Sequence, residues 1–202
     1  MNAQESLLAA AAAGDADGVR AALADGADTG ARDGQGRTAL LLASLGDHVE
    51  AARVLVAAGA DPDAQDQQSD SAWLVTGVTG SVEMMRALLP AGPDLRLRNR
   101  YGGVSVIPAS ERGHVAYVRA VLRETDIDVD HVNRLGWTAL LEAVILGDGG
   151  AAHREIVELL LAAGADPLLA DGEGVTALEH AEQRGFTAIA EVLRAAESGR
   201  AA

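Results

Sequence analysis

The chain has no cysteine and no lysine, and its 202 residues include only two Trp, two Tyr and one Phe. The absence of cysteine excludes disulfides, a thiolate nucleophile and a cysteine-ligated zinc site. It also fits a reducing compartment, so we expect a cytoplasmic location. Because aromatic rings are scarce, the core has to be built from Ala, Leu and Val, whose small side chains let helices approach closely.

The charge balance is strongly acidic, with a formal net charge of −14. Proteins that bind nucleic acid display a basic patch or stripe, and no cluster of arginines occurs in this sequence. No window approaches the roughly 18 uncharged apolar residues that a membrane-spanning helix needs. The apolar segment 1–18 has no basic start and contains Glu5, which predicts a helix rather than a targeting sequence. We therefore expect neither nucleic acid nor membrane among the partners.

The stretch from Asn133 to Pro167 shows how the chain is built. A first helical pattern opens at Thr138, whose hydroxyl can cap unpaired backbone N–H groups. A second pattern stops at Gly164, where glycine takes a left-handed conformation without strain. Helices this short are marginal in water on their own, so each apolar stripe needs a neighbour to pack against.

The same unit recurs along the chain. Successive Gly-Ala-Asp or Gly-Pro-Asp endings lie 33 residues apart, from Gly26 to Gly59 and from Gly59 to Gly92. A fixed period of about 20–50 residues is typical of a repeat architecture, in which each unit buries its apolar face against its neighbours. The shared opening Gly-x-Thr-Ala-Leu occurs at Gly36–Leu40, Gly136–Leu140 and Gly174–Leu178.

These motifs resemble the ankyrin repeat family, whose pattern is Asp-x-x-Gly-x-Thr-Pro-Leu-His, then Gly-His, then Leu-Leu and Gly-Ala-Asp. The resemblance covers nearly the whole chain. It implies an all-α fold, an ankyrin-repeat solenoid of about six helix–turn–helix units with β-turn-like loop fingers, forming a single domain over residues 1–202. The Ala- and Gly-rich composition, with Arg and no Lys, indicates a bacterial origin. The expected units are 1–32 (a cap), 33–65, 66–98, 99–132, 133–170 and 171–202 (a cap).

Three positions depart from the pattern. Trp73 stands where the other units have Leu, so we expect it in the core. Pro108 falls early in a first helix that lacks its Thr cap, which predicts a helix that starts late or bends. About five residues are inserted at Gly147–Ala152, and the glycines there predict a surface loop.

The resemblance implies a function as well as a fold. Members of the family usually bind other proteins, so we expect a non-catalytic scaffold that binds a protein partner through the concave groove and loop fingers of the central repeats. We also expect a monomer. The family's contact positions, at the loop tips and at the end of the first helix, correspond here to Arg37, Asp70, Arg100, Tyr101, Glu111, Arg112, Arg134 and Trp137.

Tyr101 and Trp137 carry the local argument for binding. They are two of the five aromatic residues, they are expected on adjacent loop tips, and Arg100 and Arg134 flank them. Interface hot spots are enriched in Trp, Tyr and Arg. The alternative is that each ring lies flat over the neighbouring loop and serves packing.

A catalytic or ligand-binding alternative rests on Glu142, His180 and Asp70. Glu142 and His180 occupy the same place in their units, and stacked helices lie about 8–10 Å apart, so the two side chains can meet. Such a pair is suited to acid–base chemistry in a pocket on the concave face of repeats three to five. We favour a structural polar ladder, because most such pairs are structural.

The acidic charge and the histidine spacing bear on partners and cofactors. An acidic module that masks a basic partner is another alternative, and its binding would weaken steeply with salt. No two histidines have the i, i+4 spacing of a helical metal site, and no phosphate loop or dinucleotide fingerprint occurs, so we expect no metal and no cofactor.

Overall fold

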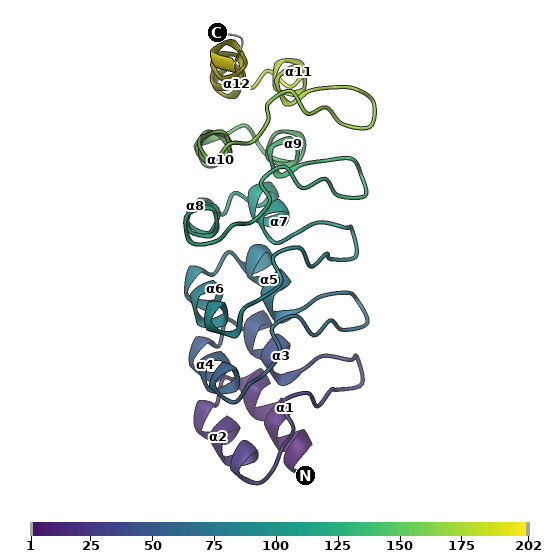
Figure 1. The fold of residues 1–202 in the computed structure, drawn as a ribbon, viewed down its shortest axis with the longest axis vertical. Helices are drawn as coiled ribbons and strands as arrows, with labels where there is room; N and C mark the ends of the chain where they lie inside the picture. Colours follow the sequence, from purple (N-terminus) through teal and green to yellow (C-terminus); the bar gives the residue numbers. More distant parts are fainter. Residues whose placement is uncertain (1, 201–202) are drawn as a thin grey trace. The chain divides into compact units, whose positions relative to one another are not determined.

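The structure is a computed structural model, and it describes residues 2–200. The chain divides into two compact units, Met1–Arg100 and Tyr101–Ala202. The first unit contains α1 (Ala3–Ala13), α2 (Ala16–Ala24), α3 (Ala39–Leu45), α4 (Val49–Ala57), α5 (Ala72–Thr79), α6 (Val82–Leu88) and the short 3-10 helix η1 (Leu89–Ala91) (Figure 1). The second contains α7 (Val106–Glu111), α8 (Val115–Glu124), α9 (Ala139–Ile145), α10 (Ala151–Ala162), α11 (Ala177–Gln183) and α12 (Thr187–Arg200).

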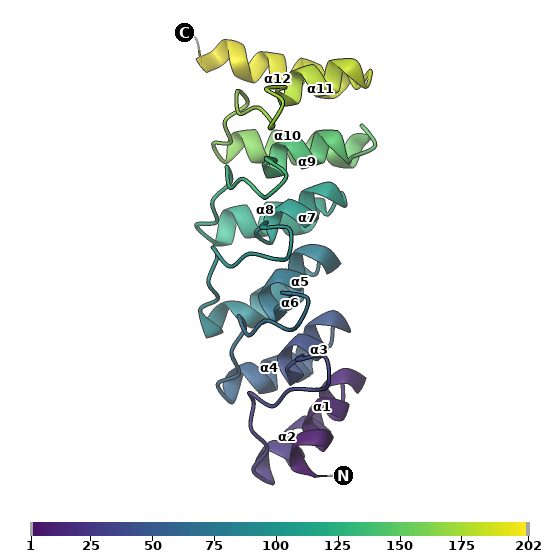
Figure 2. The same ribbon diagram turned by 90° about the vertical axis from the view of Figure 1, so that its right-hand side faces the viewer.

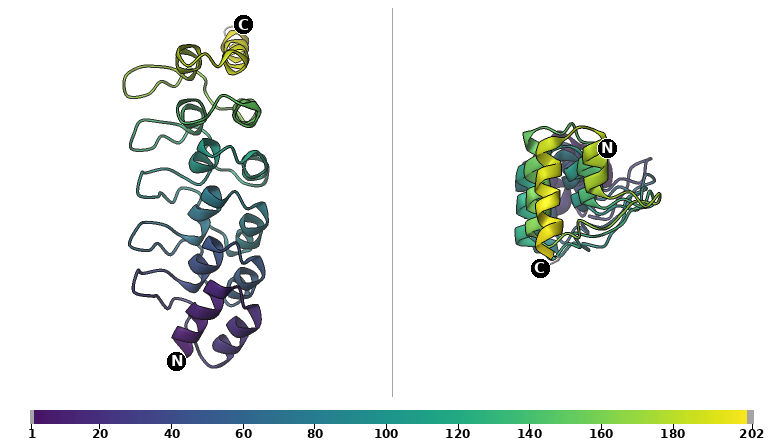
Figure 3. Two further views of the ribbon diagram at one scale, coloured as in Figure 1. Left: turned by 180° about the vertical axis from the view of Figure 1, so that it is seen from behind. Right: turned by 90° about the horizontal axis from the view of Figure 1, so that it is seen from above.

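Within each unit the helices form two layers. In the first unit α1, α3 and α5 stack on one another, as do α2, α4 and α6; in the second, α7, α9 and α11 form one layer and α8, α10 and α12 the other. Extended loops, the fingers, project from the side of the odd-numbered layer, as the two side views show (Figures 1 and 3). The view turned by 90° shows each helix lying across the stacking direction (Figure 2).

Four of the odd-numbered helices, α3, α5, α9 and α11, begin at a capping Thr or Ser, and three of these caps are the threonines of the shared opening. The hydroxyls of Thr38, Ser71 and Thr138 each accept a hydrogen bond, 3.2 Å long, from the backbone N–H three residues further on. Thr176 does the same for Glu179 and completes a capping box, because the Glu179 carboxylate bonds back to the Thr176 N–H. Caps of this kind stabilise a helix by about 1 kcal/mol each.

The unit around Pro108 lacks this cap, and its first helix is the shortest of the odd-numbered set. Val104 stands where the other units have Thr or Ser, and the N-cap of α7 is Ser105, whose side chain makes no capping hydrogen bond. Helix α7 begins four residues after Gly102, whereas α9 begins three residues after Gly136. The late start predicted from Pro108 is confirmed.

The insertion in the fifth repeat differs from the expected loop, because Ala151 and Ala152 already belong to α10. His153 lies 11 residues before Gly164, and His48 lies 11 residues before Gly59. The two histidines therefore occupy equivalent positions, counted back from the end of the second helix of their repeats. His48 Nε2 lies 3.1 Å from the Ala12 carbonyl, and His153 Nε2 lies 2.9 Å from the Glu111 carbonyl. The insertion therefore extends a helix while keeping the contact to the preceding repeat.

The core is apolar and helical. Trp73 is fully buried, which confirms its expected place in the core, and Leu40 and Leu55 lie in the same unit. Leu140 and Ile156 occupy the corresponding interior of the second unit. None of the helices in residues 2–200 is both long enough and apolar enough to span a membrane.

Candidate protein-binding fingers

Each finger is a tight turn held by the side chain of one Asp or Asn at its base. Asp33 Oδ1 accepts hydrogen bonds from the N–H groups of Gln35, at 2.8 Å, and Arg37, at 3.0 Å. Gly36 has a φ of 80°, a left-handed conformation that the turn requires. The same arrangement is built on Asp66, Asn133 and Asp171. These turns form the 33–37, 66–70, 133–137 and 171–175 fingers, and the chain passes from one unit to the other within the related loop 99–103.

Neighbouring fingers in a unit are joined through their backbones. In the first unit the Gln67 N–H donates to the Gln35 carbonyl, 3.2 Å away. In the second unit the Arg134 N–H donates to the Tyr101 carbonyl, 2.9 Å away. The fingertips of successive repeats therefore lie side by side, as the resemblance implied for Tyr101 and the 133–137 finger.

Side chains add a polar ladder to the fingers of the first unit. Arg32 donates to the carbonyl of Gly36 in its own finger, at 2.6 Å, and to the carbonyl of Gln65, at 2.7 Å. Gln65 in turn donates to Ser69, at 2.8 Å, and to Arg98, at 2.7 Å. Each rung therefore ties a finger to the one after it.

The predicted binding residues of the first unit form ion pairs with one another or with the finger base. Arg37 bonds the Asp33 carboxylate at 2.7 Å, and Arg100 lies 3.5 Å from Asp70. Partial desolvation acts to raise the pKa of Asp33, but the hydrogen bonds from Arg37 and Gln35 outweigh it and hold that pKa below its ordinary value. Burial raises the pKa of Asp70, and the Arg100 charge only partly opposes this.

Exposed apolar side chains occupy the fingers of the second unit. Tyr101 is 55% exposed, Leu135 is 53% exposed and Val132 is 48% exposed. Trp137 is half-buried, and its backbone N–H donates to Asn133 Oδ1 at 3.1 Å. The exposed apolar surface of these finger segments is therefore formed by Tyr101, Val132 and Leu135, and Trp137 exposes a smaller fraction of its side chain.

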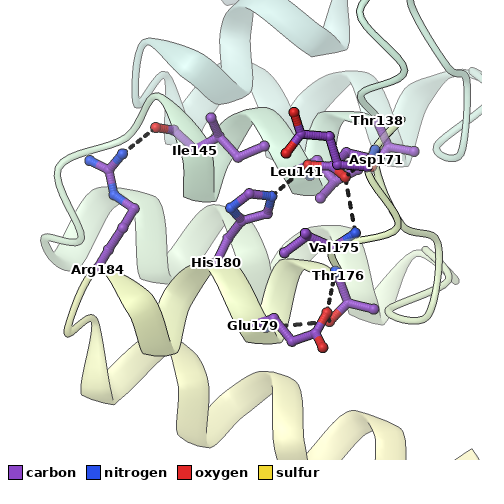
Figure 4. Close-up of polar contacts among 10 residues, drawn as sticks. Thr138, Leu141, Ile145, Asp171, Val175, Thr176, Glu179, His180 and Arg184 are labelled. Carbon is purple, nitrogen blue, oxygen red and sulfur yellow. Dashed lines mark hydrogen bonds and ion pairs between the residues drawn. The ribbon is translucent and has the colours of Figure 1, made fainter.

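Glu142 and His180 are bonded to finger bases. Glu142 Oε1 accepts a 2.7 Å hydrogen bond from Asn133 Nδ2. His180 Nε2 lies 2.7 Å from Asp171 Oδ2, a contact that Figure 4 shows. Each partner lies nine residues earlier in the same repeat. The two side chains therefore stabilise separate fingers, and the structure places their hydrogen bonds within the repeats instead of between them.

The electrostatics of the two pairs are opposite. Burial, and to a lesser extent the charge of the Glu111 carboxylate, raise the pKa of Glu142 to about 7 against the opposing effect of the hydrogen bond from Asn133. The pKa of Asp171 is lowered by the hydrogen bond from the Val175 backbone and by that from His180. The fifth repeat therefore has a buried carboxyl group that is half protonated near neutral pH.

The end of α9 and the inserted loop are bonded to the last repeat. Arg184 donates to the carbonyl of Ile145 and, at 3.0 Å, to that of Gly147, while its guanidinium stacks on Phe186 at 4.8 Å (Figure 4). The backbone of Gly149 approaches the Phe186 ring so closely that an added Cβ would overlap it. These contacts hold the inserted loop against the last repeat.

The remaining predicted contact residues lie at helix ends. Glu111 is half-buried at the end of α7, and its carbonyl accepts from His153. Arg112, which follows it, is exposed. Two features were missed from the sequence: the hydrogen bond between Asn133 and Glu142, and the exposure of Val132. The first had a usable signal, because a polar residue pair nine residues apart occurs in both of the last two repeats.

Comparison with known proteins gives the family. The sequence-family model described as ankyrin repeats (3 copies) matches residues 2–66, 72–171 and 109–200 of this chain. The chain belongs to the ankyrin repeat family. Ankyrin repeats are generally protein-interaction modules, and nothing in these matches indicates catalysis.

Two of the relatives come from named bacteria. YahD of Escherichia coli (strain K12), named as an ankyrin repeat protein, is 50% identical over 97 residues, so the match spans about half (48%) of each chain. An ankyrin repeat domain from Acinetobacter baumannii AYE is 46% identical, with a TM-score of 0.90 over 95% of this chain and 97% of that one. The ankyrin repeat domain of Bcl-3, an IkappaB family member, is 26% identical, with a TM-score of 0.84 over 95% and 85%. The predicted all-α ankyrin-repeat fold is thus confirmed, and so is the predicted relationship to bacterial proteins.

Proposed function

We propose that the protein is a non-catalytic scaffold that binds a protein partner through the fingers of its second unit. The observation that supports this is the exposure of Tyr101, Val132 and Leu135 on finger segments that are bonded to each other through the Arg134 N–H and the Tyr101 carbonyl. Exposed apolar side chains that gather on one surface mark interaction sites in soluble proteins. A family of protein-interaction modules supplies the class of partner.

The fingers are suited to binding because they are rigid before the partner arrives. Asn133 accepts from two backbone N–H groups in its finger and donates to Glu142, so the turn does not have to be ordered on association. A preorganised loop avoids part of the entropy that binding otherwise costs. Arg134, exposed at the same tip, adds a residue type that is enriched at interface hot spots.

The predicted contact residues of the first unit are proposed to contribute less to binding than those of the second. Arg37 and Asp70 already form ion pairs with Asp33 and Arg100, so their charges are less available to a partner. Glu111 and Arg112, at the end of α7, are proposed to contact the partner next to the fingers. We further propose that residues 1–202 form one repeat domain that acts as a cytoplasmic monomer.

Selection of random displayed peptides on the purified protein tests the proposal. Enriched peptides should lose at least about tenfold in affinity for the variant Tyr101→Ser/Leu135→Ser, because this variant removes the exposed anchor side chains. The double variant Gln35→Ser/Gln68→Ser changes the equivalent fingertip positions of the first unit and is the matched control. Its affinity should stay within about twofold.

Equal losses in both variants would contradict the assignment of the surface to the second unit, and so would no loss in either. Failure to enrich any peptide would contradict peptide binding by the fingers as such. The enzymatic alternative gains no support from Glu142 and His180, since each is bonded to a finger base.

A further inference from the structure

We propose that the 133–137 finger is a pH-responsive element, in which a proton on Glu142 keeps the finger closed against α9 and thereby sets the affinity for the partner. This inference rests on the proposed function and adds a means of regulation to it. The joint is the side-chain amide of Asn133, which connects the finger to the helix behind it.

Asn133 links Glu142 to the finger through both ends of its amide. The amide oxygen accepts from the backbone N–H groups of Leu135, at 2.9 Å, and Trp137, at 3.1 Å, and so holds the turn. The amide nitrogen donates to Glu142 Oε1 at 2.7 Å. A change at the Glu142 carboxyl group therefore acts directly on the side chain that shapes the finger.

Glu142 is buried without a positive charge to pair with. The residue is 6% exposed, and within residues 2–200 no cationic group is bonded to it. An ionised carboxyl group in such a place is costly, so the closed finger favours the protonated form. The raised pKa of Glu142, about 7, agrees with this geometry.

The charged groups on the elements around Glu142 do not relieve this cost. Helices α7, α10 and α11 pack against α9. The charge that acts on Glu142 is that of Glu111, on α7, and it acts in the same direction as burial. The cationic and titratable side chains on the other elements are bonded elsewhere: His153 to Asp148 and the Glu111 carbonyl, His180 to Asp171, Arg184 to the carbonyls of Ile145 and Gly147, and His131 to the carbonyl of Gly102.

The other repeats lack a carboxyl group at this position. Leu42, Val75 and Pro108 are the equivalent residues of the second, third and fourth repeats. In the last repeat the equivalent residue is His180, which is bonded to the Asp171 carboxylate. The response proposed here therefore belongs to the 133–137 finger.

Rising pH should open this finger. The ordinary pKa of a glutamate is 4.5, so the stabilisation of the closed form is fully present below pH 4.5 and is lost as the pH rises through 7. For an opening that returns Glu142 to water, the ratio of open to closed finger rises about tenfold between pH 6 and pH 8. An opened finger is no longer preorganised, so the partner should bind more weakly at the higher pH.

Solvent exchange of the Leu135 and Trp137 amide protons, measured by NMR without any peptide, tests the finger itself. After correction for intrinsic exchange, their protection should fall about tenfold from pH 6 to pH 8 in the wild type. Glu142→Gln keeps an acceptor for Asn133 and removes the charge, so its protection should be the same at both pH values. Glu173→Gln, at the tip of the 171–175 finger, is the matched control and should retain the fall. Constant protection in the wild type, or the same fall in Glu142→Gln, would overturn the proposal.

Binding of a histidine-free peptide selected on the wild-type protein tests the regulation. Its affinity should be about three- to tenfold lower at pH 8 than at pH 6, because the closed finger is less populated. Glu142→Gln should bind it equally at both pH values. A wild-type affinity that does not change with pH would overturn the regulation and leave the proposed function intact. If no peptide is enriched, the proposed function fails, and the exchange measurement still decides whether the finger responds to pH.

Discussion

The fingers of residues 1–100 and those of residues 101–202 are built on the same turn but differ in the use of their side chains. In the first unit Arg32 and Gln65 donate to backbone carbonyls of their own and the following finger. In the second unit the equivalent positions are Val132 and Ala170, which have no side-chain donor. The first set is cross-linked through polar side chains, and the second leaves apolar side chains exposed.

The helices behind the fingers differ in the same way. Leu42 and Val75 stand behind the fingers of the first unit, whereas Glu142 and His180 stand at the equivalent positions of the second. Apolar residues there make the first unit insensitive to pH at these positions. The second unit instead has polar pairs at its finger bases, and this is where we propose that a partner binds.

The two tryptophans should show the largest difference between the units. Trp73→Ala should reduce the free energy of unfolding by about 3–5 kcal/mol, because the ring is fully buried and its loss leaves a cavity. Trp137→Ala should cost about 1 kcal/mol, because that ring is half-buried on a finger. Urea unfolding followed by circular dichroism measures both. Similar losses would mean that the 133–137 finger is packed as part of the core.

Stability should depend on pH through Glu142. The pKa of Glu142 in the folded state, about 7, lies above its ordinary value of 4.5. The folded state therefore favours the protonated carboxyl group, and its full stability is present below pH 4.5 and is lost as the pH rises through 7. Glu142→Gln should therefore stabilise the protein by about 2–3 kcal/mol at pH 8 and have little effect at pH 4.5. The measurement is urea unfolding of both proteins at the two pH values. A stabilisation that is equal at both would exclude titration of Glu142 as its cause.

Exchanging the residues at the finger bases should have opposite consequences in the two units. Asn133→Asp places a second carboxylate against Glu142 and should destabilise the protein by about 2 kcal/mol at pH 8, and by less at pH 5. Asp33→Asn, its counterpart, removes the charge that Arg37 pairs with and should cost about 1 kcal/mol or less. Thermal unfolding at both pH values compares them. An Asn133→Asp variant as stable as Asp33→Asn would show that Glu142 does not face the finger base.

Substitutions in the polar ladder should have the smallest effect on stability. Gln65 and Val132 occupy equivalent positions in the two units, so each residue can be introduced at the other's position. Gln65→Val should cost about 1 kcal/mol, since it removes two donors to backbone carbonyls. Val132→Gln should install the equivalent rung and stabilise the 133–137 finger by a similar or smaller amount. It should also reduce the affinity for selected peptides, because an apolar side chain is lost from the surface. Unchanged affinity would remove Val132 from the binding surface.

Much of the fold could be predicted because repeated local rules determine it. The caps at Thr38, Thr138 and Thr176, the glycines that end the second helices and the late start caused by Pro108 all follow from residue chemistry within a few positions. The length of the inserted loop could not be predicted from local rules. Ala151 and Ala152 are good helix formers, and in the structure they belong to α10 and not to the loop.

The candidate site was harder to predict, because exposure depends on neighbours. Tyr101 and Trp137 are both aromatic residues of finger loops, yet the first is exposed and the second half-buried. Glu142 and His180 share a position in the repeat, which suggested that they bond each other. Each side chain instead bonds a residue of its own finger, nine residues earlier in the sequence. Contacts within one repeat therefore decide where these side chains bond.

The most direct test of the account is to map a selected peptide onto the isotope-labelled protein by amide chemical shifts. We expect the largest changes at residues 101–103 and 131–137, and little change at residues 33–37 and 66–70. Changes that are equally large at the fingers of the first unit, or that are confined to the even-numbered helices, would contradict this expectation.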